Sequence, residues 1–468
     1  MPQLAPAAHA SAPPHGAGGR ATLAVTATAT TVALMNYTAP MLTLPDMAAA
    51  FGTPASAQAW LLNGTPLGLA VLLLVAGSLA DAHGRRRVFL LGTLALGLTT
   101  ALGALAGSTL TFTLARVAQG AASAAVLAGS LGLLAHAYPA GRDRIRATGI
   151  WGASVSGGIA LGPLLAGVLS LADWRLAYGV LGAAALATAA IGARRLPYER
   201  PEPHRQDRRP DIAGATTLGL ALAALLTALT LGRDGWLRPQ VGLLLLTSAA
   251  LTAAFVAVEH RSRTPMVDLA LLRRPAFLAS VLGALFTGLA VIGLFSVVPA
   301  LLQGGAGMSP LGAAWLFVLW SGTAFVVALQ ARRLAARLSA PYQLILGFAL
   351  SAAGILTLLG SVEGGPWPRL LPGLVLAGAG SGLLNAALPR LAVDSVPPER
   401  AAMGAGANNT ARYIGSSAGV ALTLALGPAG PDTALLVSAG LAASGAALIL
   451  VLARGHRPGT SVAQTTSR

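Results

Sequence analysis

The sequence predicts an all-helical membrane protein with fourteen spanning helices, and three observations support this fold class. First, 55% of the 468 residues are hydrophobic and only 10% are charged, which is too few charges for the surface of a water-soluble domain. Second, apolar runs of about 20 residues, the length that crosses a bilayer as a helix, recur along the whole chain. Third, the arginines gather in alternate connections between these runs.

Fourteen apolar runs are long enough to span a bilayer. Residues 1–20 precede them. This stretch of mainly Ala, Pro, Gly and His has no basic region ahead of an apolar core, so we expect a disordered tail without a cleavable signal peptide. The runs cover approximately residues 22–42, 59–80, 88–107, 110–135, 148–169, 176–193, 212–232, 239–258, 276–302, 311–330, 342–361, 369–388, 401–426 and 433–453.

The arginines indicate the topology. All 31 basic residues are arginine, and the formal net charge is +16. With the N-terminus inside, twenty-five arginines fall in cytoplasmic segments and four in outer loops, so we expect both termini in the cytoplasm and an even number of spans. Because the arginines lie in short loops and not on one basic face, no nucleic-acid partner is expected. The chain is predicted to be a multi-pass protein of the inner (plasma) membrane.

An internal repeat predicts two related halves. A Leu-Ala pair followed by two aliphatic residues and Gly occurs at 79–92 and again at 334–347, with an identical offset of 255 residues. Ala336 stands in the second copy where Asp81 stands in the first. The predicted organisation is a tail at 1–20, a six-helix bundle at 21–193, a linker with two inserted helices at 194–275, a second six-helix bundle at 276–453 and a tail at 454–468.

Four motifs resemble those of a known family. The sequences GSLADAHGRRR at 77–87, RVAQG at 116–120 and GIALGPLLAG at 158–167 are similar to the G-x-L-a-D-r-x-G-r-r-x, R-x-x-Q-G and g-x-x-x-G-P-x-x-G-G motifs of the major facilitator superfamily. Segments 259–275 and 398–412 resemble its 14-span drug:proton antiporter branch. The resemblance covers roughly residues 22 to 453.

This resemblance implies a fold and a function. The expected fold is two six-helix bundles around a central cavity, with two inserted helices, and transporters built from repeated halves place the substrate at the interface of the halves. The implied function is export of small lipophilic compounds such as drugs, antibiotics or secondary metabolites by alternating access, in exchange for protons. The alternatives are a metabolite carrier without proton coupling and a transporter-like membrane sensor or assembly protein. The expected partners are a small-molecule substrate, protons and the lipid bilayer, and the protein is expected to be monomeric.

The turn between the second and third helices is the first candidate site. Gly77 and Gly84 allow close packing and positive φ, and Asp81 ends one helix beside Arg85 and Arg86. A carboxylate there can pair with arginine or with a helix N-terminus. We interpret the turn as a conformational latch that holds one transport state; the alternative is a solvated turn that only sets topology.

Two arginines lie inside predicted spans and are candidates for cavity lining or coupling. A charge there costs several kcal/mol unless it meets water, a partner or backbone carbonyls. Arg116 has Gln119 one turn further on the same face, and Arg412 lies near the middle of its helix close to Asn409. For both arginines, a structural contact within the protein is the alternative.

One departure from the family pattern concerns the first helix. The drug antiporters carry an acid about nine residues before a Leu-Pro pair, and here Leu44-Pro45 places Asn36 at that position. Arg116 and Arg412 would give the cavity a net positive charge. Asn36, Tyr37, Asn63 and Gln119 would make it polar. Two hypotheses follow: substrates are neutral or anionic, and any proton coupling uses Asp81 or the titration of the substrate itself.

The antiporter-like segment has its own physical interpretation. Pro163 removes the helix hydrogen bond to the carbonyl of residue 159 and kinks the helix, while Gly158, Gly162 and Gly167 let a second helix approach closely. The resemblance implies that the segment packs at the interface of the halves and is associated with exchange. The alternative is a kinked packing helix without that role.

The sequence does not support a catalytic, metal-binding or nucleotide-binding function. The chain has no cysteine, and its seven histidines are dispersed without the spacing of metal ligands. A nucleotide-binding P-loop is also missing. No enzyme activity, metal or cofactor is therefore expected. Trp151, Trp315 and Trp320 either line an apolar cavity or pack in the core and against lipid.

Overall fold

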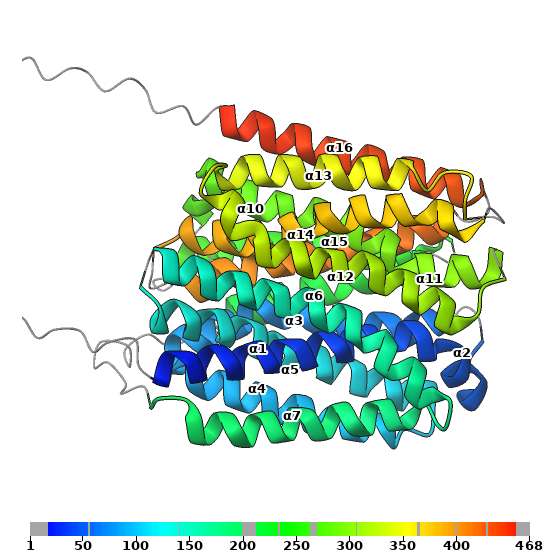
Figure 1. Ribbon diagram of the computed structural model, residues 1–468. Coiled ribbons are helices and arrows are strands. Elements are labelled where there is room, and N and C mark those ends of the chain that lie inside the picture. Colours follow the sequence, from blue (N-terminus) through cyan, green and yellow to red (C-terminus); the bar gives the residue numbers. More distant parts are fainter. Residues whose placement is uncertain are drawn as a thin grey trace, which may run out of the picture.

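A computed structural model describes residues 17–54, 57–139, 141–198, 212–232, 235–262, 269–305, 307–362, 366–397, 400–426 and 429–454. The helices of the first half run side by side with those of the second half in one bundle (Figure 1). The first half contains α1 (Ala17–Thr38), α2 (Pro40–Phe51), α3 (Gln58–His83), α4 (Arg85–Ala104), α5 (Thr109–Ala137), α6 (Arg142–Ser170) and α7 (Arg175–Arg195). The inserted pair is α8 (Ile212–Gly232) and α9 (Pro239–Arg261).

The second half follows a short 3₁₀ helix, η2 (Leu269–Arg273). It contains α10 (Pro275–Phe286), the π-helix η3 (Thr287–Ile292), α11 (Gly293–Gly305), α12 (Pro310–Ala335), α13 (Ala340–Leu356), the 3₁₀ helix η4 (Trp367–Arg369), α14 (Leu370–Asp394), α15 (Ala401–Ala425) and α16 (Pro431–Arg454). Nine helices of the described segments are long and apolar enough to cross a membrane, and three shorter apolar helices accompany them. The all-helical prediction is confirmed, and the count of fourteen spans stays a prediction.

Two predicted helices are interrupted. The predicted run 22–42 is divided into α1, which begins at Ala17, and α2, because Pro40 lacks the N–H that would continue the α1 hydrogen bonds. The predicted run 276–302 contains the π-turn η3, which the apolar pattern alone did not reveal. The predicted tails and linker lie for the most part outside the described residues.

The helices pack in a similar order in the two predicted halves, whose relation by an internal repeat stays a prediction. In the first half α3 packs on α5, and α4 packs on α5 and α7. In the second half α12 packs on α14, and α13 packs on α14 and α16. The halves meet through α6 with α12 and through α3 with α15. The start of α1 and the end of α16 lie on the same side of the bundle, as an even number of crossings requires (Figure 1).

The two halves share a buried apolar cluster on the side that carries these chain ends. Val393 at the end of α14 and Ala401 and Ala405 at the start of α15 belong to the same buried apolar cluster as Trp151 and Leu131 of the first half. A second cluster lies within the second half. The inserted α8 packs on α9 and touches α3 and α15.

Glycines bring α15 against η3 without space for a side chain. A methyl group on Gly288 would meet the carbonyl oxygen of Arg412, and one on Gly415 would meet the carbonyl oxygen of Leu285. This backbone contact holds α15 close to η3 at the level of Arg412. By contrast, a methyl group on Gly440 of α16 would have no atom within 4 Å.

We expect Gly415→Ala to destabilise the protein by about 1–3 kcal/mol, because the added methyl group forces two helix backbones apart. Gly440→Ala is the matched control and should be neutral or slightly stabilising, since alanine favours helix where space is open. Thermal unfolding of both purified variants in the same detergent checks this. Equal unfolding temperatures for the two variants would contradict the close packing.

Candidate functional site

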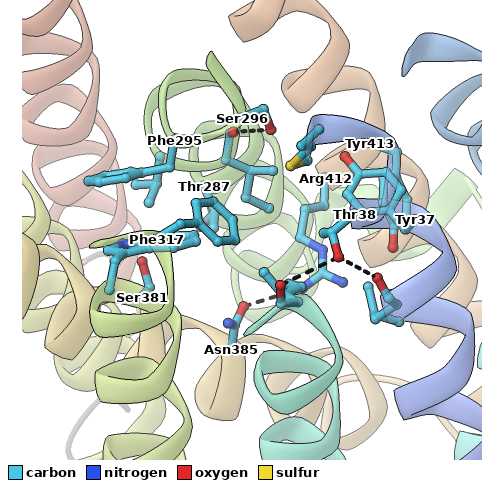
Figure 2. Close-up of a pocket in the computed structure, with 16 residues that line it drawn as sticks. Tyr37, Thr38, Thr287, Phe295, Ser296, Phe317, Ser381, Asn385, Arg412 and Tyr413 are labelled. Carbon is cyan, nitrogen blue, oxygen red and sulfur yellow. Dashed lines mark hydrogen bonds between the residues drawn. The ribbon is translucent and has the colours of Figure 1, made fainter. Parts of the chain in front are cut away.

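A narrow pocket lies between the two halves, with a cavity volume of about 30 Å³ in the described state. Figure 2 shows Phe295, Phe317 and Ser381 on one side, Tyr37, Thr38 and Tyr413 on the other, and Arg412 between them. The lining residues are Leu34, Tyr37, Thr38, Met41, Ile159, Thr287, Val291, Ile292, Phe295, Ser296, Phe317, Trp320, Ser381, Asn385, Arg412 and Tyr413.

Aromatic side chains form two walls of the pocket. Phe295 of α11 stacks on Trp320 of α12 with ring centroids 4.5 Å apart and an interplanar angle of 8°. Phe317 lies one turn before Trp320, with its ring centroid 5.2 Å away. On the other side Tyr37 of α1 meets Tyr413 of α15 edge to face at 5.8 Å. The pocket therefore presents flat apolar surfaces from both halves.

Arg412 is the only charged residue among the lining residues. Its side chain is 3% exposed. One guanidinium nitrogen donates to the Asn385 side-chain oxygen at a long 3.4 Å, and the guanidinium lies 5.5 Å from the centre of the Tyr413 ring. Asn385 in turn donates to the Ser156 hydroxyl of the first half at 3.2 Å. The arginine thus belongs to a polar bridge between the halves.

Arg116 is buried differently, inside the first half and away from the pocket lining. Its guanidinium donates to the Asn36 carbonyl at 2.7 Å, the Asn36 side-chain oxygen at 3.0 Å and the Tyr37 carbonyl at 3.2 Å. Because Pro40 has no N–H, the Asn36 carbonyl lacks its usual helical donor, and Arg116 supplies one. Arg116 therefore stabilises the break between α1 and α2, and a coupling role for it stays a prediction.

Gln119 completes this cluster, as the helical spacing indicated. Its side-chain oxygen accepts from Arg116 at 2.9 Å and its amide donates to the Thr99 carbonyl at 3.1 Å. The Asn36 amide donates to the Thr100 hydroxyl. Asn36 therefore meets Arg116 as a neutral partner at the position where the family pattern has an acid.

Two further predicted cavity residues lie elsewhere. Asn63 of α3 donates to the Thr230 hydroxyl of the inserted α8 at 3.3 Å. Asn409 donates to the Ala405 carbonyl of its own helix at 3.0 Å. Of the seven residues predicted for the cavity, the structure thus places Tyr37 and Arg412 in the pocket lining, and their function in transport stays a prediction.

The predicted latch turn begins at the buried Gly77 and reverses direction at Gly84, whose φ is 98°. Arg85 is buried and donates to the Gly132 carbonyl at 3.2 Å, so it joins α4 to α5. Arg86 donates to the Ala193 carbonyl at 2.7 Å and to the Leu196 carbonyl at 3.3 Å, at the end of α7. The Asp81 side chain lies outside the described part of the chain, and the latch stays a prediction.

The antiporter-like segment of α6 packs on the first helices of its own half. Methyl groups on Gly158 and Gly162 would meet the Thr31 and Met35 carbonyls of α1, and one on Gly167 would meet Leu42 of α2. These three glycines therefore approach α1 and α2 of their own half, and the expected packing of the segment at the interface of the halves stays a prediction. Another face of α6 contacts the second half, where Gly152 and Gly157 approach Asn385 and Phe325.

Pro163 acts as expected on the local hydrogen bonding. It cannot donate to the Ile159 carbonyl, and the Thr38 hydroxyl of α1 lies 3.4 Å from that oxygen (Figure 2). Any role of this segment in exchange stays a prediction.

Sequence reasoning missed Ser381 and Asn385 of α14. They are polar, four residues apart and therefore on one face of a predicted span, a signal that could have identified them. It also did not predict that Phe295 and Trp320 stack. Among the described residues, no three His, Asp or Glu side chains lie close enough together to hold a metal ion.

We expect Arg116→Gln to destabilise the protein more than Arg369→Gln, which removes an exposed arginine of η4. Loss of Arg116 leaves the buried acceptors at the α1 break unpaired, at a cost of about 1–3 kcal/mol for each. Thermal unfolding in detergent measures both variants. If Arg116→Gln unfolded at the wild-type temperature, the stabilising role of the cluster would be wrong.

Comparisons with known proteins agree with this architecture. A family model described as Major Facilitator Superfamily matches residues 26–420. Puromycin resistance protein pur8 of Streptomyces alboniger is 33% identical, over 86% of this chain and 80% of its own. Multidrug resistance protein Stp of Mycobacterium tuberculosis is 32% identical, over 81% of this chain and 70% of its own. The probable actinorhodin transporter of Streptomyces coelicolor is 31% identical, over 93% of this chain and 79% of its own.

Solved structures show the same fold at low sequence identity. The crystal structure of the human organic anion transporter MFSD10 (TETRAN) superposes with a TM-score of 0.67 at 19% identity, covering 92% of this chain and 99% of that one. The family match and the relatives lead to one conclusion: the chain belongs to the major facilitator superfamily.

Proposed function

We propose that the protein exports small lipophilic compounds such as drugs, antibiotics or secondary metabolites through the pocket between its halves. The observation that carries this proposal is the position of the pocket, which is lined by residues of both repeated halves. Substrate sites of transporters with repeated halves lie at this interface. The names of the relatives, which include resistance proteins and a probable antibiotic transporter, support the same class of substrate.

The packing supports alternating access. Two helix pairs join the halves, α6 with α12 and α3 with α15. If one half rocked against the other, the two helices of each pair would slide along each other. On the side of the chain ends, the apolar cluster that includes Val393, Ala401 and Ala405 joins the two halves. With both termini in the cytoplasm, we interpret this arrangement as a state closed toward the cytoplasm.

The proposed orientation can be tested by labelling, because the chain contains no native cysteine. Leu237, between α8 and α9, is 100% exposed, and Arg454 ends α16 on the side of the chain ends. In intact cells an impermeant maleimide should label Leu237→Cys and not Arg454→Cys, and lysis should expose the second. Labelling of both from outside would contradict the orientation.

The transport function can be tested with a pocket-filling variant. Ser381 is 3% exposed and lines the pocket, whereas Ser444 lies on the exposed face of α16. In a host without its own pumps, the wild-type protein should raise resistance across a panel of antibiotics. Ser381→Leu should remove most of that resistance by occupying the pocket, and Ser444→Leu should retain it. A folded protein that confers no resistance and transports nothing would favour the sensor or assembly alternative.

We also propose that export is exchanged for protons. The support is the resemblance to drug:proton antiporters, although no lining residue of the pocket is Asp or Glu. Proteoliposome transport with an imposed pH gradient decides this part. Flux should fall severalfold when the gradient is collapsed, and unchanged flux would favour the carrier without proton coupling.

A further inference from the structure

Four polar atoms of the pocket have no hydrogen-bond partner among the described residues: Trp320 Nε1, Ser381 Oγ, Arg412 Nε and the Tyr413 hydroxyl. All four side chains are between 2% and 5% exposed. A buried polar group without a partner costs about 1–3 kcal/mol, and such groups are uncommon in folded proteins. These four residues line one pocket, where a ligand can complete their hydrogen bonds.

The other polar side chains of the pocket are already satisfied. The hydroxyls of Thr38, Thr287 and Ser296 donate to carbonyls of their own helices, at 3.0, 2.7 and 2.7 Å. The Asn385 oxygen accepts from Arg412, and its amide donates to Ser156. The four remaining groups can all donate, and the indole and guanidinium N–H groups can only donate. A matching ligand must therefore supply hydrogen-bond acceptors, such as oxygens.

The charge of the pocket restricts the ligand further. Arg412 is positive, and no lining residue is acidic. The difference from Arg116 is informative: Arg116 makes hydrogen bonds of 2.7 to 3.2 Å to oxygens of its own half, whereas Arg412 has one bond of 3.4 Å. A buried cation with so little compensation favours an anion, which forms short charge-assisted hydrogen bonds with a guanidinium.

The aromatic walls of the pocket indicate the apolar part of the ligand. The stacked Phe295 and Trp320 rings and the edge-to-face Tyr37 and Tyr413 rings present flat apolar surfaces on either side of Arg412 (Figure 2). Planar ring systems pack well against such walls. The described state leaves a cavity volume of about 30 Å³, so a ring system enters as the two halves move apart in the proposed alternating access.

We propose that this pocket selects aromatic anions, meaning fused-ring compounds that carry a carboxylate or an acidic phenol. Arg412 binds the anionic oxygen, while Trp320 Nε1 and the Ser381 hydroxyl donate to further oxygens of the ligand. The proposal rests on the proposed export function only for its physiological meaning, because binding can be measured without transport.

The test compares two dyes with the same three-ring xanthene core and opposite charge: fluorescein, an anion at neutral pH, and rhodamine 123, a cation. Fluorescence anisotropy measures their binding to the purified full-length protein in detergent. The wild-type protein should bind fluorescein at least about tenfold more tightly than rhodamine 123, since one charge-assisted hydrogen bond already contributes a factor of this size. Equal or tighter binding of rhodamine 123 would overturn the proposal.

Variants of Arg412 test whether the preference for the anionic dye arises in this pocket. Arg412→Gln should weaken fluorescein binding by about tenfold to a hundredfold and leave rhodamine 123 binding unchanged or stronger. Arg412→Lys, which keeps the charge and loses the planar fork, should be intermediate. Arg369→Gln, which removes an exposed arginine, is the control and should bind both dyes as the wild type does. Unchanged fluorescein binding by Arg412→Gln would also overturn the proposal.

Two milder variants keep the test decisive if Arg412→Gln does not fold. Trp320→Phe retains a ring and removes the N–H donor, and Ser381→Ala removes the hydroxyl; each should weaken fluorescein binding severalfold. Wild-type affinity in both variants would contradict the proposal. Efflux of the same dyes from cells separates the two hypotheses: tight fluorescein binding without export contradicts only the export function, whereas export of rhodamine 123 and not of fluorescein contradicts only the anion selectivity.

Discussion

The cost of burying a guanidinium group away from water governs the centre of this structure. Two arginines lie inside the bundle, and each has to recover the hydration that it loses. Arg116 recovers it from two backbone carbonyls at a helix break and from the side-chain oxygens of Asn36 and Gln119. Arg412 recovers little from the protein and faces a pocket between two bundles. The same residue type thus stabilises a helix break in one half and leaves a weakly compensated charge beside the pocket at the interface.

Much of the architecture follows from composition and pattern. Apolar length predicts helices wherever it is continuous, and the offset between the Leu-Ala repeats predicts two similarly packed halves. The details that depend on single residues are harder to predict. Pro40 was visible in the sequence, but only the fold brings Arg116 next to the carbonyl that this proline leaves free. The apolar pattern of residues 276–302 contains nothing that distinguishes a π-turn from an α-helix.

The residues of the candidate site could also be predicted only in part from the sequence. Arg412 and Tyr37 could be identified because polar side chains are costly inside spans. Which of the polar residues share one pocket depends on helix rotation, which the weakly amphipathic sequences of these helices do not specify. Arg116, Asn36 and Gln119 satisfy one another within the first half, whereas Ser381 and Asn385, equally visible in the sequence, face the interface. A charge within a span indicates that something must compensate it, but the sequence does not say whether the protein or a ligand does so.

The π-turn at 287–292 has a consequence for how ligand preference can change. Its i→i+5 hydrogen bonding adds a residue to one turn, and in an α-helix each residue corresponds to a rotation of about 100°. Phe295 and Ser296, which follow this turn, therefore owe their direction toward the pocket to the length of the preceding turn. A one-residue deletion or insertion there would turn Phe295 and Ser296 away from the pocket and bring a different face of α11 toward it. Ligand preference would then change through a shift of helical register, without substitution of Phe295 or Ser296.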